Sequence, residues 1–296
     1  MQGVSVIIPC YNAGKFIREA VASVHASAPE TPYEIIIVDD GSTDAETSTA
    51  LQEIAENDPK ARVFSMSRNS GQSAARNYAI EIAKYDVIVP LDADDKMART
   101  KSGAYIDLAY KTLSKTPDIV SVTSAYRQFG AVSGQCPALP YKPEFQLVKS
   151  LLPPFSAYRR AEAMAIEGYD VRKRFAEDWD FFTSLINKRF VAGQSMDVAV
   201  LSDMHIEYRT HATGLNSSVA DRMPKAVALE SIMNRSPEIY DHFYPGKTPR
   251  DLGSLASMLK VGFRMAASDP VGVCQLAASV IKRRVYGRMS ANLDHH

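Results

Sequence analysis

The chain has 296 residues, of which 46% are hydrophobic and 23% are charged, with 34 basic side chains against 34 acidic ones. This length can bury a substantial core, and the composition excludes a disordered or fibrous chain. A net charge of zero also argues against a general nucleic-acid binder, because such proteins carry a basic excess.

Strands and helices alternate through the first hundred residues. Short apolar runs rich in β-branched residues predict buried strands, and stretches with helical spacing of apolar residues separate them. In chain order we expect strand 4–8, helix 15–27, strand 34–38, helix 45–56, strand 61–66, helix 71–84 and strand 87–91. This alternation predicts an α/β fold with a doubly wound, mostly parallel central sheet flanked by helices.

The pattern changes after about residue 100. We expect a helix over 101–113, a strand over 119–126, an irregular segment with a short helix over 137–154, a helix over 177–189, and one or two strands over 199–209. From about Ser218 the sequence favours helices interrupted at Pro237, Pro245, Pro249 and Pro270. The later part of the chain is therefore predicted to be less regular than the first.

Cysteine content and hydropathy bear on location. Cys10, Cys136 and Cys274 are widely spaced and form neither a metal-binding pattern nor a disulfide framework, which is typical of a reducing compartment. The N-terminus has no basic leader of the secretory type. No stretch approaches the roughly 20 apolar residues that span a bilayer. We therefore expect a cytoplasmic protein.

Two acidic clusters follow strands of the predicted sheet. Asp39 and Asp40 end one strand, and Asp92, Asp94 and Asp95 follow another. In open α/β sheets, ligands bind at the carboxyl ends of the strands. A single aspartate there is usually a turn residue or a helix cap, but five carboxylates at two strand ends repel each other unless a cation lies among them. The first hundred residues, with 15 acidic and 9 basic side chains, are acidic overall.

The spacing of the second cluster points to a divalent metal. On an extended segment Asp92 and Asp94 point the same way, so their carboxylates can share one ion. Hard oxygen ligands select Mg²⁺ or Mn²⁺, and these ions keep open positions for substrate phosphates. The sequence therefore predicts Mn²⁺ or Mg²⁺ together with a diphosphate-bearing substrate.

Four segments resemble the hallmarks of the family 2 glycosyltransferases, which are inverting enzymes of the GT-A fold. The segments are residues 4–12, 37–44, 68–77 and 91–95. Each alone is moderately specific, whereas four in the correct order and spacing are strongly so. The resemblance extends over about residues 3–215. It implies a nucleotide-sugar-binding half (1–100) and an acceptor-binding half (101–215) of one GT-A domain, and the sequence beyond it predicts a C-terminal helical extension (216–296).

The resemblance implies a nucleotide-diphospho-sugar donor, with a UDP-sugar expected. The residues that it places against the nucleotide are Pro9, Tyr11, Asn12, Asp39, Asp40, Arg76, Asp92 and Ala93. Asp39 can accept a hydrogen bond from a uracil N–H, and Tyr11 can stack on the ring. Asp92 and Asp94 are implied to hold the metal on the diphosphate, with Asp95 as a further contributor.

A fifth segment, residues 175–181, resembles the Glu-Asp motif that supplies the catalytic base in this family. Acidic residues favour the first turn of a helix in any protein, but with the upstream motifs Asp178 becomes the expected base and Glu177 the fallback. The base would remove the acceptor proton in a single displacement that inverts the anomeric carbon. The neighbouring Trp179 is expected either to offer a sugar-facing surface or to lie in the core.

Two further positions follow from the resemblance. Tyr208-Arg209-Thr210-His211 resembles a Tyr-Arg-x-His segment, which implies that His211 joins the metal site and that Arg209 contacts the diphosphate. The alternative for both is an ordinary surface or hydrogen-bonded residue. Ser156 lies in a segment, 153–157, that resembles the border of the acceptor pocket.

The C-terminal region, residues 216–296, falls outside the resemblance. A stretch with an apolar helical face ends in a basic group, Lys282, Arg283, Arg284 and Arg288. Such a basic amphipathic helix can lie on an anionic membrane surface. The alternative is a helix packed on the catalytic domain or on a partner subunit.

The predicted activity is transfer of a sugar to a hydroxyl of a glycan or lipid-linked glycan, in the synthesis of a cell-surface polysaccharide. One alternative is a sugar-nucleotide nucleotidyltransferase, although residues 9–15 lack the Gly-rich, basic phosphate loop of those enzymes. Another is a catalytically inactive GT-A binding module. The presence of Asp92, Asp94 and Asp178 argues against inactivity.

Overall fold

The computed structural model of the chain describes residues 1–211, 225–254, 263, 264 and 267. Within them nine strands form one sheet. In chain order these are β1 (Val4–Cys10), β2 (Tyr33–Asp39), β3 (Ala61–Ser65), β4 (Val87–Pro90), β5 (Lys96–Met97), β6 (Ile119–Gly130), β7 (Gly134–Cys136), β8 (Ala157–Arg159) and β9 (Asp197–Thr210). Their order across the sheet is β3-β2-β1-β4-β8-β6-β9-β5, with β7 paired to β6.

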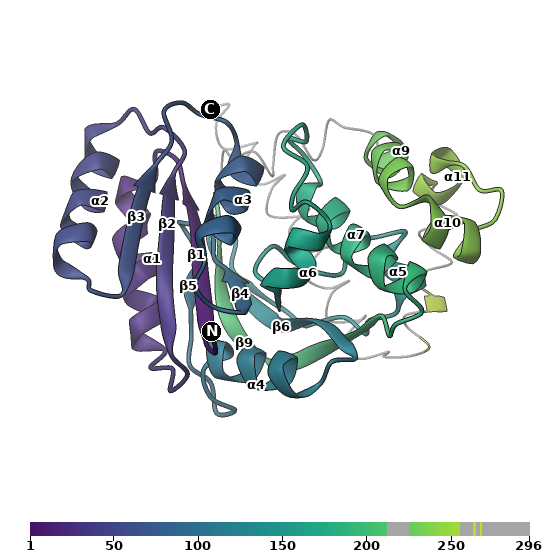
Figure 1. Ribbon diagram of the computed structural model, residues 1–296, viewed down its shortest axis with the longest axis horizontal. Coiled ribbons are helices and arrows are strands. Elements are labelled where there is room, and N and C mark those ends of the chain that lie inside the picture. Colours follow the sequence, from purple (N-terminus) through teal and green to yellow (C-terminus); the bar gives the residue numbers. More distant parts are fainter. Residues whose placement is uncertain (212–224, 255–262, 265–266, 268–296) are drawn as a thin grey trace, which may run out of the picture.

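Helices cover both faces of this sheet (Figure 1). They are α1 (Gly14–Ala26), α2 (Ala45–Asn57), α3 (Gln72–Ile82), α4 (Tyr105–Lys115), α5 (Pro143–Gln146), α6 (Arg160–Ala165), α7 (Glu177–Val191), α9 (Lys225–Arg235), α10 (Pro237–Phe243) and α11 (Pro249–Gly253). The first core cluster joins the sheet to α3, α5, α6, α7 and the helices after residue 224. The second joins the opposite face to α1, α2 and α4.

The alternation of side chains along the central strands fills both clusters. Ile7 and Ile36 belong to the cluster under α3 and α7, whereas their neighbours Ile8 and Ile35 belong to the cluster under α1 and α2. All four side chains are fully buried. A strand that is covered on both faces has no polar side, which explains the continuous apolar runs in the sequence.

The pairing of the strands is mostly parallel. β1 pairs in parallel with β2 and β4, and β2 pairs in parallel with β3. The short β8 runs antiparallel between β4 and β6, and β6 then pairs in parallel with β9 along its length. The predicted α/β class with a mostly parallel, doubly wound sheet is confirmed.

The long elements follow the sequence prediction, as does the short α5 within 137–154, whereas four other short elements were missed. No expectation covered β5, β7, β8 or α6, which are two to six residues long. Pro237 and Pro249 each stand in the first turn of a helix, where the missing N–H is no loss, so the predicted interruptions fall just before them. The basic group at 282–288 and Cys274 lie outside the described residues.

Two further expectations concern the cysteines and the membrane. Cys10 and Cys136 are both buried free thiols. In the described part of the chain, no helix combines the length and the apolar character needed to cross a bilayer.

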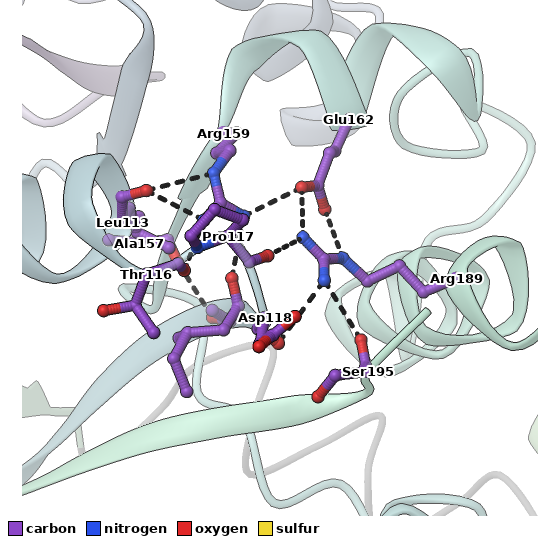
Figure 2. A network of polar contacts seen from close by, with 11 residues as sticks. Leu113, Thr116, Pro117, Asp118, Ala157, Arg159, Glu162, Arg189 and Ser195 are labelled. Atoms are coloured by element: carbon purple, nitrogen blue, oxygen red, sulfur yellow. Dashed lines mark hydrogen bonds and ion pairs between the residues drawn. The ribbon is translucent and has the colours of Figure 1, made fainter. Parts of the chain in front are cut away.

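A polar network fastens the C-terminal end of α7 to the sheet (Figure 2). Arg189, only 6% exposed, pairs with Glu162 of α6 at 2.6 Å and donates to the carbonyl oxygens of Pro117 and Ser195 at 2.9 and 3.0 Å. Arg159 also pairs with Glu162, at 2.8 Å. Arg189 lies eleven residues after Asp178, the second residue of α7. At 1.5 Å per residue, the two are about 16 Å apart along the helix.

Candidate active site

The candidate site lies where β1, β2 and β4 end and α3 and α7 begin. Parallel strands present their carboxyl ends at one edge of the sheet, so segments that follow different strands come together there. The acidic residues after β2 and β4, the start of α3 and the Glu-Asp pair at the start of α7 all meet at this edge.

Two residues expected at the nucleotide base remain accessible. The ring of Tyr11 is 45% exposed just after β1. Asp39 ends β2 and is half-buried, with its Oδ1 accepting a hydrogen bond from the Ser42 N–H at 3.0 Å. Asn12 holds the same edge, because its Oδ1 accepts from the Thr43 N–H at 2.8 Å. An exposed ring beside a half-buried carboxylate suits a planar base with an N–H donor.

Asp40 is occupied by the backbone of the loop before α3. Its carboxylate is 3% exposed and accepts hydrogen bonds from the N–H groups of Ser70 and Gly71, both at 2.7 Å. Gly71 has a φ of 96°, a left-handed value that favours glycine. Asp40 therefore builds the turn that leads into α3, and it has little surface left for a ligand.

Truncation of Asp40 should thus affect mainly stability, whereas truncation of its neighbour Asp39 should affect mainly donor binding. We expect Asp40→Ala to lower the free energy of unfolding by about 2 kcal/mol, because two backbone donors lose their buried partner. Asp39→Ala should change stability less and weaken donor binding more. Urea denaturation and donor titration of both variants measure this contrast. Equal loss of stability in the two variants would contradict the assignment.

Arg76 connects the metal motif to the predicted base. Its side chain is fully buried on α3. Nη1 donates to Asp178 Oδ1 at 2.7 Å, and Nη2 donates to Asp92 Oδ1 at 2.8 Å. Glu177 lies 3.8 Å from Nη1, and the Tyr169 ring centroid lies 5.2 Å from the guanidinium carbon. The arginine therefore joins two segments that the sequence separates by more than eighty residues.

Asp178 has the electrostatic setting of a general base. Burial raises the pKa of its carboxyl to about 7, with Glu177 and Asp92 adding to the rise and Arg76 opposing it. The side chain still keeps 20% of its surface exposed. A carboxylate with a pKa near neutrality and an accessible edge is suited to accept a proton.

Asp94 and His211 are the two metal candidates that the fold brings together. Asp94 Oδ2 lies 2.6 Å from His211 Nε2, although the two residues are far apart in sequence. Burial and the nearby Asp92 raise the pKa of Asp94, and His211 opposes the rise. Carboxylate oxygen and imidazole nitrogen both serve as ligands of Mn²⁺.

The other two acidic candidates have different partners. Asp92 accepts hydrogen bonds from Arg76 and from Gln72 Nε2, the latter at 2.8 Å. Asp95 is 2% exposed and accepts from the Arg209 N–H at 2.7 Å. Burial, Asp92 and Asp94 together raise the pKa of Asp95 well above its ordinary value.

The donor set fits a cation that is held only partly by protein. Among the described residues no three His, Cys, Asp or Glu side chains converge on one point as a ready metal site. Asp94 and His211 would supply two ligands, which leaves positions for substrate phosphates and water. Mg²⁺ and Mn²⁺ commonly bind in this way.

Several contacts hold Arg209 beside residues 92–95, which we call the acidic loop. Its guanidinium lies 4.6 Å from the ring centroid of Phe16 and 4.3 Å from that of Phe129. It also donates to the Asp94 carbonyl at 2.9 Å and pairs with Glu19. These contacts fix the path of the acidic loop, so Arg209 helps to hold the metal candidate Asp94 in place.

Trp179 and Ser156 are buried. Trp179 is 7% exposed, packs in the first core cluster and donates from Nε1 to the Gln146 carbonyl at 2.6 Å. Of the two expectations for this tryptophan, the structure shows the core position. Ser156 is fully buried, and its Oγ donates to the Pro153 carbonyl at 2.8 Å and lies 3.0 Å from the Thr123 hydroxyl.

Pro9 and Ala93 also lie at this edge, half-buried and 7% exposed respectively. Two residues of the site were missed from the sequence. Gln72 contacts Asp92, and Tyr169 packs against Arg76. Gln72 lies inside the third resembling segment, and Tyr169 lies in a segment, 167–170, that resembles the border of the acceptor pocket, but the contacts of these residues with Asp92 and Arg76 follow from the fold alone.

Comparison with known proteins bears on this geometry. Residues 5–132 match the model described as glycosyl transferase family 2. A putative teichuronic acid biosynthesis glycosyltransferase, TuaG, of Bacillus subtilis is 43% identical over 99 residues, which are 33% of this chain and 38% of that protein. A teichoic acid poly(glycerol phosphate) polymerase of Staphylococcus epidermidis is 30% identical over 129 residues, 44% of this chain and 18% of that protein. The matches span less than two fifths of these relatives.

Solved structures share the fold across nearly the whole chain. S. aureus TarS 1-349 in complex with UDP-GlcNAc aligns with a TM-score of 0.54 and 18% identity, covering 98% of this chain and 92% of TarS 1-349. The mannosyltransferase PcManGT from Pyrobaculum calidifontis, in complex with GDP-Man and Mn²⁺, aligns with a TM-score of 0.57 and 18% identity, covering 97% and 84%. Residues 5–132 thus match the glycosyl transferase family 2 model, within a chain that has the GT-A fold.

Proposed function

We propose that the protein transfers a sugar from a nucleotide-diphospho-sugar to an acceptor hydroxyl of a glycan or lipid-linked glycan, with inversion at the anomeric carbon. The observation that carries this proposal is the double ion pair of Arg76, which holds Asp178 and Asp92 on either side of one buried guanidinium. A base and a phosphate-facing acidic motif therefore lie within reach of one substrate. The family match and the names of its relatives support a role in making a cell-surface polysaccharide.

For the donor we propose a UDP-sugar. Tyr11 offers an exposed ring for stacking, and Asp39 offers a carboxylate oxygen to an N–H of the base. The neighbour TarS binds UDP-GlcNAc, whereas the neighbour PcManGT binds GDP-Man, so the fold accommodates both nucleotides. In this proposal, Asp39 is the side chain that selects the nucleobase of the donor.

Asp94 and His211 would hold Mn²⁺ or Mg²⁺ against the diphosphate. When bound, the cation supplies a Lewis acid that stabilises the charge of the departing nucleotide diphosphate. The chain's own contribution is to keep Asp94 and His211 in register. It does so through Arg209 of β9, which donates to the Asp94 carbonyl, while His211 directly follows β9.

The acceptor proton goes to Asp178. Its Oδ1 accepts from Arg76, which leaves Oδ2 to take the proton of the acceptor hydroxyl. As the hydroxyl oxygen attacks the anomeric carbon, the bond to the diphosphate breaks on the opposite face and the proton passes to Oδ2. Arg76 meanwhile fixes the rotamer of the carboxylate and limits the rise of its pKa.

A donor screen tests the proposal directly. In the presence of Mn²⁺, we expect UDP-sugars to raise the unfolding temperature, since a ligand at 100 times its Kd stabilises a protein by about 2.7 kcal/mol. Transfer from the stabilising donor to glycan acceptors is then measured. Synthesis of a sugar nucleotide from nucleoside triphosphate and sugar phosphate would instead identify a nucleotidyltransferase. Donor binding without any turnover would identify an inactive module.

A further inference from the structure

Asp180 lies two residues after the proposed base in the first turn of α7 and is fully buried with two cationic partners. Its Oδ1 is 2.6 Å from Lys173 Nζ, in the loop before α7, and its Oδ2 pairs with Arg235 at the end of α9. Helix α9 packs alongside α7 (Figure 1). A buried carboxylate bonded through both oxygens is held from two sides, so removal of one cationic partner frees one of its oxygens.

The same arginine also reaches the turn that precedes Tyr169. Arg235 Nη2 donates to the carbonyl oxygens of Ile166 and Gly168 at 2.9 and 2.8 Å. Tyr169 then exchanges two hydrogen bonds of 2.8 Å with Asn77, which follows Arg76 on α3. One guanidinium of α9 thereby holds both the first turn of α7 and the turn beside α3.

Tyr169 carries this restraint to the base. Its ring stacks on Phe181 with centroids 4.0 Å apart and an interplanar angle of 6°, and it lies 5.2 Å from the guanidinium of Arg76. Arg76 in turn binds Asp178. Contacts therefore run from Arg235 to Asp178 by two routes, one through Asp180 and one through Tyr169 and Arg76.

The entry into α7 needs such a restraint. Ala176, directly before Glu177, has a φ of 56°, a left-handed value that a residue with a Cβ adopts only when its surroundings impose it. The Asp180 N–H bonds the Ala176 carbonyl at 3.0 Å. The ion pairs of Asp180 thus fix the segment that carries both acidic residues of the Glu-Asp pair.

We propose that Arg235, in the region after residue 216, is a positioning residue that holds Asp178 in its reactive orientation through Asp180 and Tyr169. This inference rests on the proposed function, in which Asp178 is the base. Helix α9 would then take part in positioning the base, although α9 lies outside residues 5–132, the segment that matches the family.

Arg189 offers a matched control for the test. Like Arg235 it pairs with a carboxylate and donates to two or more carbonyl oxygens (Figure 2). It belongs to α7 itself, but it lies in the last turn of that helix, away from Asp178. Arg189→Met should destabilise the protein about as much as Arg235→Met does. It removes no contact to the first turn of α7.

We expect Arg235→Met to lower kcat for transfer by about tenfold or more, since small displacements of a reacting group slow catalysis strongly. The KM for the donor should stay within about twofold, because Tyr11 and Asp39 are untouched. Arg189→Met should retain its kcat. Amide hydrogen exchange should quicken over residues 176–180 in Arg235→Met only.

Two results would overturn the inference. One is unchanged kcat and unchanged exchange at 176–180 in Arg235→Met, and the other is an equal loss of kcat in both variants. If the wild-type protein transfers no sugar from any donor, the proposed function fails, whereas hydrogen exchange still decides whether Arg235 restrains the first turn of α7. If Arg235→Met does not fold, Arg235→Lys replaces it, since lysine keeps the charge beside Asp180 but loses the pair of carbonyl contacts.

Discussion

Replacing Asp178 with asparagine should lower the rate of sugar transfer by about 10²–10⁴-fold, the range over which a general base contributes. Asparagine has nearly the same shape and still accepts a hydrogen bond from Arg76, so the fold and donor binding should persist. It cannot accept the acceptor proton. Single-turnover transfer assays, with donor binding measured in parallel, test both halves of this expectation.

The dependence of kcat/KM on pH gives the same prediction a second readout. Because burial raises the pKa of Asp178 to about 7, the side chain is protonated in acid and cannot act as a base there. The rate should therefore rise with pH through about 7 and then level off. The residual activity of Asp178→Asn should lack this rise.

Glu177→Gln is the matched control for this experiment. Glu177 stands next to Asp178 and lies 3.8 Å from the same arginine atom. Loss of the Glu177 carboxylate should lower the rate of transfer far less, because Asp178 and not Glu177 is the proposed base. A Glu177 variant as slow as Asp178→Asn, or an Asp178→Asn enzyme with normal turnover, would move the base elsewhere.

Removal of divalent metal should lower transfer by about 10²-fold or more, since a Lewis-acid cation supplies several kcal/mol of transition-state stabilisation. Treatment with EDTA should abolish activity, and Mn²⁺ or Mg²⁺ should restore it. Asp94→Asn should raise the metal concentration needed for half-maximal activity, because one of the two protein ligands becomes neutral.

Asp203→Asn controls for a general effect of removing a carboxylate. Asp203 is paired with Ser102 away from the acidic loop, so this variant should require no more metal than the wild-type protein. Full activity of the wild-type enzyme in a rigorously metal-free assay would rule out the assignment of Asp94 and His211. Equal metal requirement of Asp94→Asn and wild type would do the same.

The fold was predictable to the extent that its signals are local. The strands predicted at 4–8, 34–38, 61–66 and 87–91 contain short runs of apolar residues. Helices such as 45–57 have a regular spacing of apolar residues. β8 has three residues, and its place between β4 and β6 is decided by pairing across the sheet. No local periodicity can encode a strand of that length.

The candidate site was predictable as a set of segments but not as a set of contacts. Resembling motifs singled out Arg76 as a nucleotide contact, whereas the structure shows it bound to Asp92 and Asp178. The pairing with Asp178 spans 102 positions, so it follows from the topology of the sheet. Asp40 illustrates a different reason, because its backbone partners carry no side-chain signature in the sequence.

The position of β8 has a consequence for how the chain can be divided. β8 closes the gap between β4 and β6, and β9 covers the other side of β6. A fragment that stops at residue 132, where the family match ends, would leave β4 and β6 with unpaired backbone groups and buried faces opened to water. Exposed edges of this kind recruit other chains. We therefore expect residues 5–132 to fold poorly by themselves, so that biochemical dissection should keep at least the chain through β9.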